Sequence, residues 1–300
     1  MFHTIIAGHD LKDGGEDALS LGRMLADSSE ANLVVAGVLP LGQLPYDIGP
    51  ALGEGAHRLG EGIRARAHDI GVEPQVLRSR STARGLHELA EGMHADLIIV
   101  GSSRRGRAGD ILAGNVGLQL LHGAPCAVAV APVGYSEEEP DLKNIVVGVD
   151  GSKEAETAAV MAAELALATD ASIELVAVAE PPPLVYGKGG GAANGYGELQ
   201  AAVREVVQAD LDEVVAKMPA EASVFGRMVD GDASDMLAEA ASDASLLVIG
   251  SRGYGPIGRV LLGSTDAALM RKAPCPVVVL PRQKGRGTVE TALGGQEALI

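Results

Sequence analysis

The stretch "ASLLVIGSRGYGPIGRVLLGST" (Ala244–Thr265) joins an apolar run to a glycine-rich turn and then to a short segment with two hydroxyl side chains. Gly250 ends the apolar run, and Gly253 stands where the backbone must turn with positive φ or approach another group closely. Gly263–Thr265 then precedes "DAALMRKA", which has the pattern of a helix start. This order of strand, turn and helix is typical of an α/β unit whose turn faces a ligand.

Three segments of the first half of the chain recur, in the same order, in the second half. The pairs are "TIIAGHD" (4–10) with "NIVVGVD" (144–150), "ADLIIVGSSRRG" (95–106) with "ASLLVIGSRGYG" (244–255), and "GAPCAVAVAPVG" (123–134) with "KAPCPVVVLPRQ" (272–283). A period this long indicates two copies of one domain rather than a solenoid. We expect a first domain over residues 1–134, a second over 143–283, and a tail over 284–300 that is expected to be disordered.

Each half alternates short apolar segments with helical segments. Strands are expected at 4–9, 32–39, 74–79, 96–101 and 126–131, and again at 144–150, 172–180, 223–229, 245–250 and 276–281. A helix is expected after Ser152, its N-cap, and a Pro/Gly-rich loop over Pro181–Gly197 precedes a long amphipathic helix. Continuously apolar strands between helices indicate a parallel sheet covered on both faces. The expected fold is two tandem doubly wound α/β domains, Rossmann-like, each a five-stranded parallel sheet with helices on both faces.

Composition restricts the classes of partner. Hydrophobic residues make up 47% of the chain and aromatic residues 2%, so the cores must consist of Ala, Val, Leu and Ile. The formal net charge of −16 argues against a nucleic-acid-binding surface and implies weak affinity for anionic membranes. Cys126 and Cys275 occupy the same place in the two repeats and are expected to be buried structural thiols. With no signal peptide and no membrane-spanning run, a cytoplasmic protein is expected.

Ligands of open α/β sheets bind beyond the carboxyl ends of the strands. In the second half this position holds Asp150 after the first strand, Val178 at the end of the second and Gly250 at the end of the fourth. A helix that begins at Gly263–Thr265 offers unpaired N–H groups to a phosphate. The plainer alternative is a glycine-rich connection in which Ser264 only caps a helix.

The residues Gly250, Gly253, Gly263 and Ser264 fit the pattern Gly-x2-Gly-x9-Gly-(Ser/Thr). This pattern resembles the nucleotide-binding motif of universal stress proteins. The segments "VVGVDGS" and "APCPVVVL" resemble the first and last strands of that family, and the two halves together extend the resemblance over nearly the whole chain. The chain is therefore similar to a tandem-domain, ATP-binding universal stress protein.

The resemblance implies that ATP is the cofactor. Asp150 would then lie by the ribose and the metal, backbone at Val178 would receive the adenine, and the glycine motif would hold the phosphates with Arg252 and Arg259 as cationic partners. The candidate cofactor-binding residues of the second half are Gly148, Asp150, Val178, Gly250, Ser251, Arg252, Gly253, Arg259, Gly263, Ser264 and Thr265, with Asp150 as ligand of a magnesium or manganese ion. The plainer alternative for Asp150 is a residue that caps the next turn.

The first half departs from the motif. The weaker candidates there are Gly8, Asp10, Val38, Gly101, Gly114 and Asn115. Arg104 replaces the second glycine, so either this half binds nucleotide less well or Arg104, Arg105 and Arg107 form a different anion site. A solvated basic turn is the plainer alternative. His9, beside Asp10 at a strand end, is a further candidate.

The resemblance implies a stress-response regulator with no or slow ATP hydrolysis and no catalytic residue. No Walker A pattern is present in the sequence. Two alternatives stay open: an adenylating α/β enzyme, and an interaction module that binds no nucleotide. Universal stress proteins generally dimerise, so the two domains are expected to pair as an intramolecular pseudo-dimer through "AVAVA" or "PVVVL", and a homodimer of two chains stays open.

Overall fold

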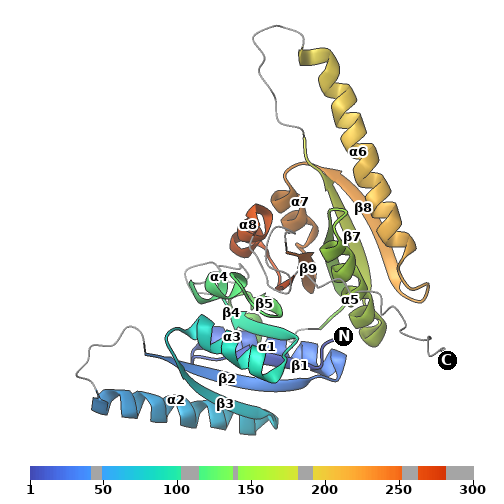
Figure 1. The fold of residues 1–300 in the computed structure, drawn as a ribbon. Coiled ribbons are helices and arrows are strands. Elements are labelled where there is room, and N and C mark those ends of the chain that lie inside the picture. The colour runs from blue at the N-terminus through green and yellow to red at the C-terminus, as the bar shows by residue number, and fades with distance from the viewer. Residues whose placement is uncertain (42–48, 103–114, 138–140, 182–191, 252–262, 282–300) are drawn as a thin grey trace, which may run out of the picture.

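The computed structural model describes residues 1–41, 49–102, 115–137, 141–181, 192–251 and 263–281 (Figure 1). The first half contains β1 (Thr4–Gly8), α1 (Asp13–Ser29), β2 (Asn32–Pro40), α2 (Gly49–Ile70), β3 (Glu73–Ser79), α3 (Thr82–Met93), β4 (Leu97–Gly101), α4 (Asn115–Leu121) and β5 (Ala127–Ala131). A 3-10 turn, η1 (Tyr135–Glu137), follows. The second half contains β6 (Asn144–Val149), α5 (Lys153–Thr169), β7 (Ser172–Ala179), α6 (Ala192–Ala216), β8 (Ser223–Asp230), α7 (Ala233–Ala240), β9 (Leu246–Gly250), α8 (Ser264–Lys272) and β10 (Val277–Leu280).

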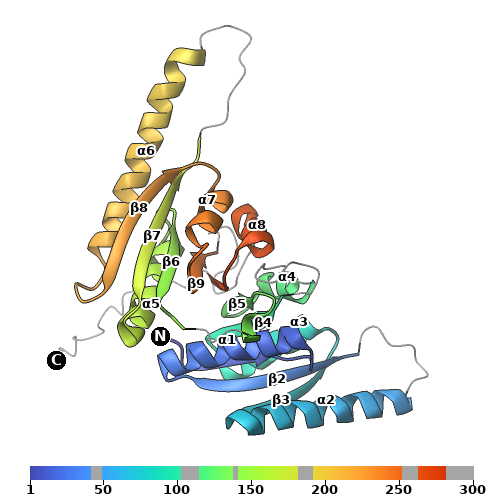
Figure 2. The same cartoon turned by 180° about the vertical axis from the view of Figure 1, so that it is seen from behind.

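All ten expected strands are present, and together they form one sheet. The strand order is β3-β2-β1-β4-β5-β10-β9-β6-β7-β8. Within each half the pairing is parallel throughout, as expected from the apolar strands. The two five-stranded halves therefore share the same order and join into a single ten-stranded sheet, which Figures 1 and 2 show from two sides.

The two halves meet through β5 and β10, which are the two strands that the sequence suggested as pairing edges. These strands run antiparallel, with Val278 opposite Ala129, Val277 opposite Val130 and Val279 opposite Val128. Ala129 and Val278 hold equivalent positions in the two repeats, so a pseudo-twofold axis passes between them. This pairing removes two strand edges that would otherwise be exposed.

Helices cover both faces of the sheet, as expected for a doubly wound fold. Ile5 and Ala7 of β1 belong to the core beneath α1, α2, α5 and α6, whereas Ile6 belongs to the core beneath α3, α4, α7 and α8. Alternate side chains of one strand point to opposite faces, which explains why a continuously apolar strand is needed. Both cores consist mainly of Ala, Val, Leu and Ile, as the composition requires.

The first turn of α5 has the predicted cap. The Ser152 side chain accepts a hydrogen bond from the Ala155 N–H at 3.1 Å. The loop expected over Pro181–Gly197 is shorter, because α6 begins at Ala192. The first six residues of α6, "AANGYG", include poor helix formers such as glycine, and the long amphipathic segment that follows extends the helix over them because propagation costs little after nucleation.

Burial raises the pKa of Cys126 and of Cys275 to about 12, so both thiols stay protonated at neutral pH.

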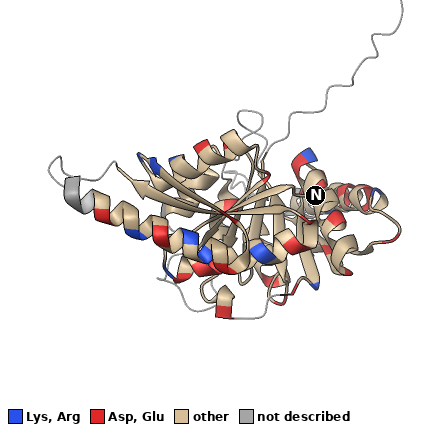
Figure 3. Cartoon of the chain, turned by 90° about the horizontal axis from the view of Figure 1, so that it is seen from below, with Lys and Arg blue, Asp and Glu red and all other residues tan. Residues whose placement is uncertain are grey.

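Within the described ranges, no helix has the length and apolar character that crossing a bilayer requires. Lys and Arg alternate with Asp and Glu along the helices seen in Figure 3. The sequence contains 40 acidic and 24 basic residues, so acidic side chains outnumber basic ones.

Candidate functional site

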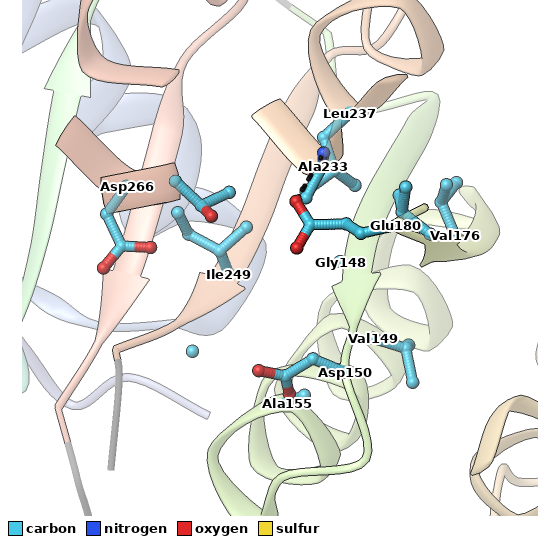
Figure 4. Close-up of a pocket in the computed structure, with 13 residues that line it drawn as sticks. Gly148, Val149, Asp150, Ala155, Val176, Glu180, Ala233, Leu237, Ile249 and Asp266 are labelled. Carbon is cyan, nitrogen blue, oxygen red and sulfur yellow. Dashed lines mark hydrogen bonds between the residues drawn. The ribbon is translucent and has the colours of Figure 1, made fainter. Parts of the chain in front are cut away.

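A pocket of the second half lies at the carboxyl ends of β6, β7 and β9, where the strand order reverses between β6 and β9. Five of the residues proposed from sequence line it: Gly148, Asp150, Val178, Gly250 and Thr265. Figure 4 shows that the lining side chains come from three strand ends and from the starts of α7 and α8. The fold thus brings together residues that are far apart in the sequence.

The other candidates of the second half lie around this pocket or outside the described residues. Gly263 is the N-cap of α8, and Ser264 is the exposed first residue of that helix. Ser251 is 2% exposed, its N–H donates to the Leu280 carbonyl at 2.9 Å, and its hydroxyl has no partner among the described residues. Arg252, Gly253 and Arg259 lie outside the described residues.

Asp150 is exposed and shapes the turn that follows β6. One oxygen of its carboxylate accepts hydrogen bonds from the Ser152 N–H at 3.1 Å and from the Ser152 hydroxyl at 2.5 Å. The residue between them, Gly151, has φ 73°, a value that favours glycine. The turn-forming role suggested as the plainer alternative is therefore present, and Asp150 also lines the pocket.

Two more carboxylates line the pocket, and the sequence reasoning missed both. Glu180 accepts a hydrogen bond from the Ala233 N–H at 3.1 Å, at the start of α7. Asp266 is 5% exposed and accepts one from the Gly263 N–H at 2.8 Å. Two signals could have found them: Glu180 stands two residues after Val178, hence on the same side of the chain, and Asp266 is in the first turn of the predicted helix.

The three carboxylates make this pocket acidic. Figure 4 shows Asp150, Glu180 and Asp266 around the same space. An anionic ligand in this place is repelled unless a cation accompanies it. In the described part of the chain, no group of three or more His, Cys, Asp or Glu side chains is arranged to hold a metal ion. A cation at Asp150 therefore fits only if oxygen atoms of the ligand complete its coordination.

The first half has a pocket at the equivalent place. Gly8, Asp10, Val38 and Gly101 line it, together with the buried Ser102. The Asp10 carboxylate lies 3.1 Å from the Lys12 ammonium. Asn115 begins α4, whereas Gly114 and the three candidate arginines Arg104, Arg105 and Arg107 lie outside the described residues.

His9 also lines this pocket, and it is 3% exposed. Its Nδ1 accepts a hydrogen bond from the Leu11 N–H at 2.9 Å, and its Nε2 lies 3.5 Å from an oxygen of Glu16. Burial lowers the pKa of His9, and the nearby Glu16 carboxylate opposes this effect in part. His9 is therefore neutral at pH 7. Val149 holds the equivalent position in the second half.

The two pockets differ in their charge. At the position of Glu180 the first half has Pro40, and at the position of Asp266 it has Gly117. Among the described residues that line the first pocket, Asp10 is the one carboxylate, and its charge is partly balanced by Lys12. The repeated fold therefore encloses two chemically different spaces.

Tandem α/β repeats with a pocket at each switch point define a duplicated, doubly wound α/β protein. A family model described as "Universal stress protein family" matches residues 1–132 and 141–281. The chain belongs to the universal stress protein family.

Similar proteins and a similar solved structure support this assignment. The chain is 26% identical to universal stress protein Rv2319c of Mycobacterium tuberculosis over 225 residues, which cover 73% of this chain and 75% of the relative. It is 32% identical to Rv2005c of the same species over 197 residues, covering 62% and 61%. A universal stress protein from Archaeoglobus fulgidus has the same fold, with a TM-score of 0.66 and 20% identity over 93% of this chain and 98% of that one.

Proposed function

We propose that the chain is an ATP-binding regulator of a stress response, acting in the cytoplasm, with no or slow ATP hydrolysis. The observation that carries the proposal is the pocket of the second half, in which Val178, Asp150 and Thr265 from three separate elements line one space. An adenine base packs against the half-buried Val178, and the ribose lies by Asp150. The phosphates lie at the start of α8, where backbone N–H groups have no partner within the helix.

The acidic lining gives the cation a definite role in this proposal. ATP brings further negative charge toward Asp150, Glu180 and Asp266. A magnesium or manganese ion that bridges Asp150 and the phosphates offsets this repulsion, and it supplies charge neutralisation at the phosphates when bound. ATP alone is therefore expected to bind less tightly than ATP with the divalent ion.

We expect no or slow hydrolysis from the carboxylates of the described lining, whereas Arg252 and Arg259, the candidate cationic partners of the phosphates, lie outside the described residues. Phosphoryl transfer requires groups that neutralise the charge developing on the phosphates and that orient the attacking water. Among the described residues that line the second pocket, none is Lys, Arg or His. The carboxylates present there are poorly suited to stabilising a growing negative charge.

Thr265→Asp tests the site without destabilising helix α8. A carboxylate in the first turn of α8 is favourable to the helix, because it faces the positive end of the helix dipole. The same carboxylate repels a phosphate. The matched control is Thr82→Asp, which puts the same charge in the first turn of α3 at the pocket of the first half.

The measurement is the thermal unfolding of the full chain with ATP and magnesium. At a ligand concentration of about 100 Kd, binding stabilises the native state by about 2.7 kcal/mol. For a chain of 300 residues that unfolds as one unit, that corresponds to a rise in Tm of about 4 °C. The rise should vanish in Thr265→Asp and persist in Thr82→Asp. A rise that survives in Thr265→Asp, or one that is absent in the unmodified protein, contradicts the proposal.

A further inference from the structure

The pseudo-twofold axis relates two grooves between the halves of the molecule, on the face covered by α1 and α5. The linker that leaves β5 fills one of them. Asp17 of α1, which is 1% exposed, accepts hydrogen bonds from the Gly134 N–H at 3.1 Å and the Ser136 N–H at 2.9 Å. It also accepts one from the Ser136 hydroxyl at 2.8 Å. The linker is therefore anchored to the first helix of its own half.

The linker is also part of the hydrophobic core. Tyr135 is 7% exposed and its hydroxyl oxygen lies 3.7 Å from the Met24 sulfur of α1. Leu142, which leads into β6, is 3% exposed in the same core. The chain that follows β5 thus closes the groove along α1.

The equivalent groove along α5 is open in the described part of the chain. Thr157, Val160 and Glu164 of α5 line one wall, and Phe2 and Asp96 of the first half line the other. Phe2 is the equivalent of Leu142, and the two helices that form the walls, α1 and α5, have 17 residues each. Val160 is 43% exposed. Its equivalent on α1 is the half-buried Ser20, so α5 exposes an apolar side chain where α1 has a less exposed polar one.

The end of β10 lies at this groove. Leu280 and Pro281 line it, and the chain continues from Pro281 into residues 282–300, which lie outside the described residues. In the first half, the corresponding continuation from Ala131 into Pro132 is the linker that fills its groove. The position of the last described residue thus places the start of residues 282–300 at the mouth of an equivalent groove.

The charges of the groove and of the following segment are complementary. In the segment after Pro281, Arg282, Lys284 and Arg286 carry three positive charges, and the first acidic residue of that segment is Glu290. The groove presents three carboxylates, Asp96, Glu156 and Glu164, and two ammonium groups, those of Lys153 and of the chain terminus at Met1. Asp96 already accepts the N–H groups of His3 and Thr4, and Glu156 is paired with Lys217.

The third carboxylate, Glu164, lies where a contact to the linker is found in the other half. In the filled groove Tyr135 contacts Met24, and the equivalents of these two residues are Lys284 and Glu164. A hydrogen bond from a hydroxyl to a sulfur in one half thus corresponds to a pair of opposite charges in the other. The α-ammonium of Met1 already lies against Glu164, so Lys284 would share this carboxylate with it.

We propose that the segment following Pro281 docks in the groove along α5, with Lys284 at Glu164 and the backbone near Gly285 at Thr157. It covers Val160 in the way the linker covers α1. Exposed ion pairs contribute little each, so the docking combines apolar burial with several weak charge contacts and weakens as salt increases. The inference rests on the fold alone and does not depend on nucleotide binding.

A cross-link tests the register of the docked segment. Thr157 and Gly285 are the equivalents of Asp17 and Ser136, which are in hydrogen-bond contact. In the full chain, Thr157→Cys with Gly285→Cys should form an intramolecular disulfide under mild oxidation, because docking brings the two Cα atoms within the roughly 4.4–6.8 Å that a disulfide needs. Cys126 and Cys275 are buried with raised pKa and do not compete.

The control pair is Ala65→Cys with Gly285→Cys, which uses an exposed position on α2. Preferential cross-linking at position 157 supports the proposal. Equal cross-linking of the two pairs means that the segment samples the surface at random, and disulfides only between chains mean that a second copy occupies the groove. Either result overturns the proposal.

Labelling of Val160→Cys with a maleimide measures the docked population. Labelling of the full chain should be slower than labelling of a chain that ends at Pro281, and a tenfold difference corresponds to about nine-tenths docked. High salt and Lys284→Glu should each restore fast labelling in the full chain, so the measurement does not depend on the folding of the shortened chain. Equal rates in the full chain and in Lys284→Glu overturn the proposal.

Discussion

Replacing Gly250 by alanine distinguishes two roles of this glycine in the motif: close packing against α5 and service to a ligand. A Cβ at Gly250 would lie 2.6 Å from the Glu154 carbonyl carbon and 2.8 Å from the Ala155 nitrogen, both in the first turn of α5. Ordinary contacts begin near 3.4 Å, so the backbone of α5 must retreat by more than half an ångström. The clash involves backbone on a helix fixed by its own core, so a rotamer change cannot relieve it.

The expected cost follows from this geometry. Overpacking of a core costs about 1–3 kcal/mol, and a clash with helix backbone belongs at the upper end of that range. For Gly250→Ala we expect a loss of about 3 kcal/mol, or about 5 °C in Tm without any ligand. The assay is thermal unfolding followed by circular dichroism in ligand-free buffer.

Gly92→Ala is the matched control. Gly92 is an exposed residue of α3, and a Cβ there meets nothing within 4 Å. Alanine should stabilise this helix position by up to about 1 kcal/mol. If Gly250→Ala unfolds at the temperature of the unmodified protein but loses its response to ATP, the packing explanation is wrong and the glycine serves the ligand.

Three further outcomes are expected. Asp17→Ala should lower the free energy of unfolding in urea by about 2–3 kcal/mol, because it removes a buried charged acceptor that holds the half-buried Gly134 N–H and the N–H and hydroxyl of the exposed Ser136; a loss below 1 kcal/mol would show that the linker is not held there. Because the pKa of His9 is lowered in the native state, the unfolded chain binds more protons than the native chain below about pH 6.5, and the free energy of unfolding falls as the pH decreases. His9→Val should make this fall less steep, whereas His57→Gln at an exposed site should not. Chelation of divalent ions should reduce the ATP-induced rise in Tm; an unchanged rise would mean that the carboxylates around Asp150 need no bridging cation.

The sequence alone predicted the arrangement of the sheet well, for a simple physical reason. Buried parallel strands must be apolar on both faces, so segments such as the one ending at Gly250 stand out against the helices. The duplication supported each strand assignment a second time, because every strand of one half has an equivalent apolar segment in the other. The same duplication indicated β5 and β10 as the pairing edges.

The chemistry of the pocket was harder to predict. Glu180 and Asp266 belong to no motif, and their place in the lining depends on how α7 and α8 pack against the strand ends. Packing in three dimensions also sets the surroundings of His9, which lines the pocket of the first half and is buried beside Glu16. A pattern along the chain carries little information about such neighbours.

The glycine motif therefore contains residues kept for different reasons. A Cβ at Gly101 would lie 1.9 Å from the Gly14 carbonyl oxygen, just as one at Gly250 would clash with α5. Both halves need the first glycine for the fold, whether or not they hold a ligand. The first half can thus lose the second glycine to Arg104 and still keep its five strands. It follows that the strand-end glycine is evidence for the fold, and that only the later positions of the motif, up to Thr265, bear on nucleotide binding.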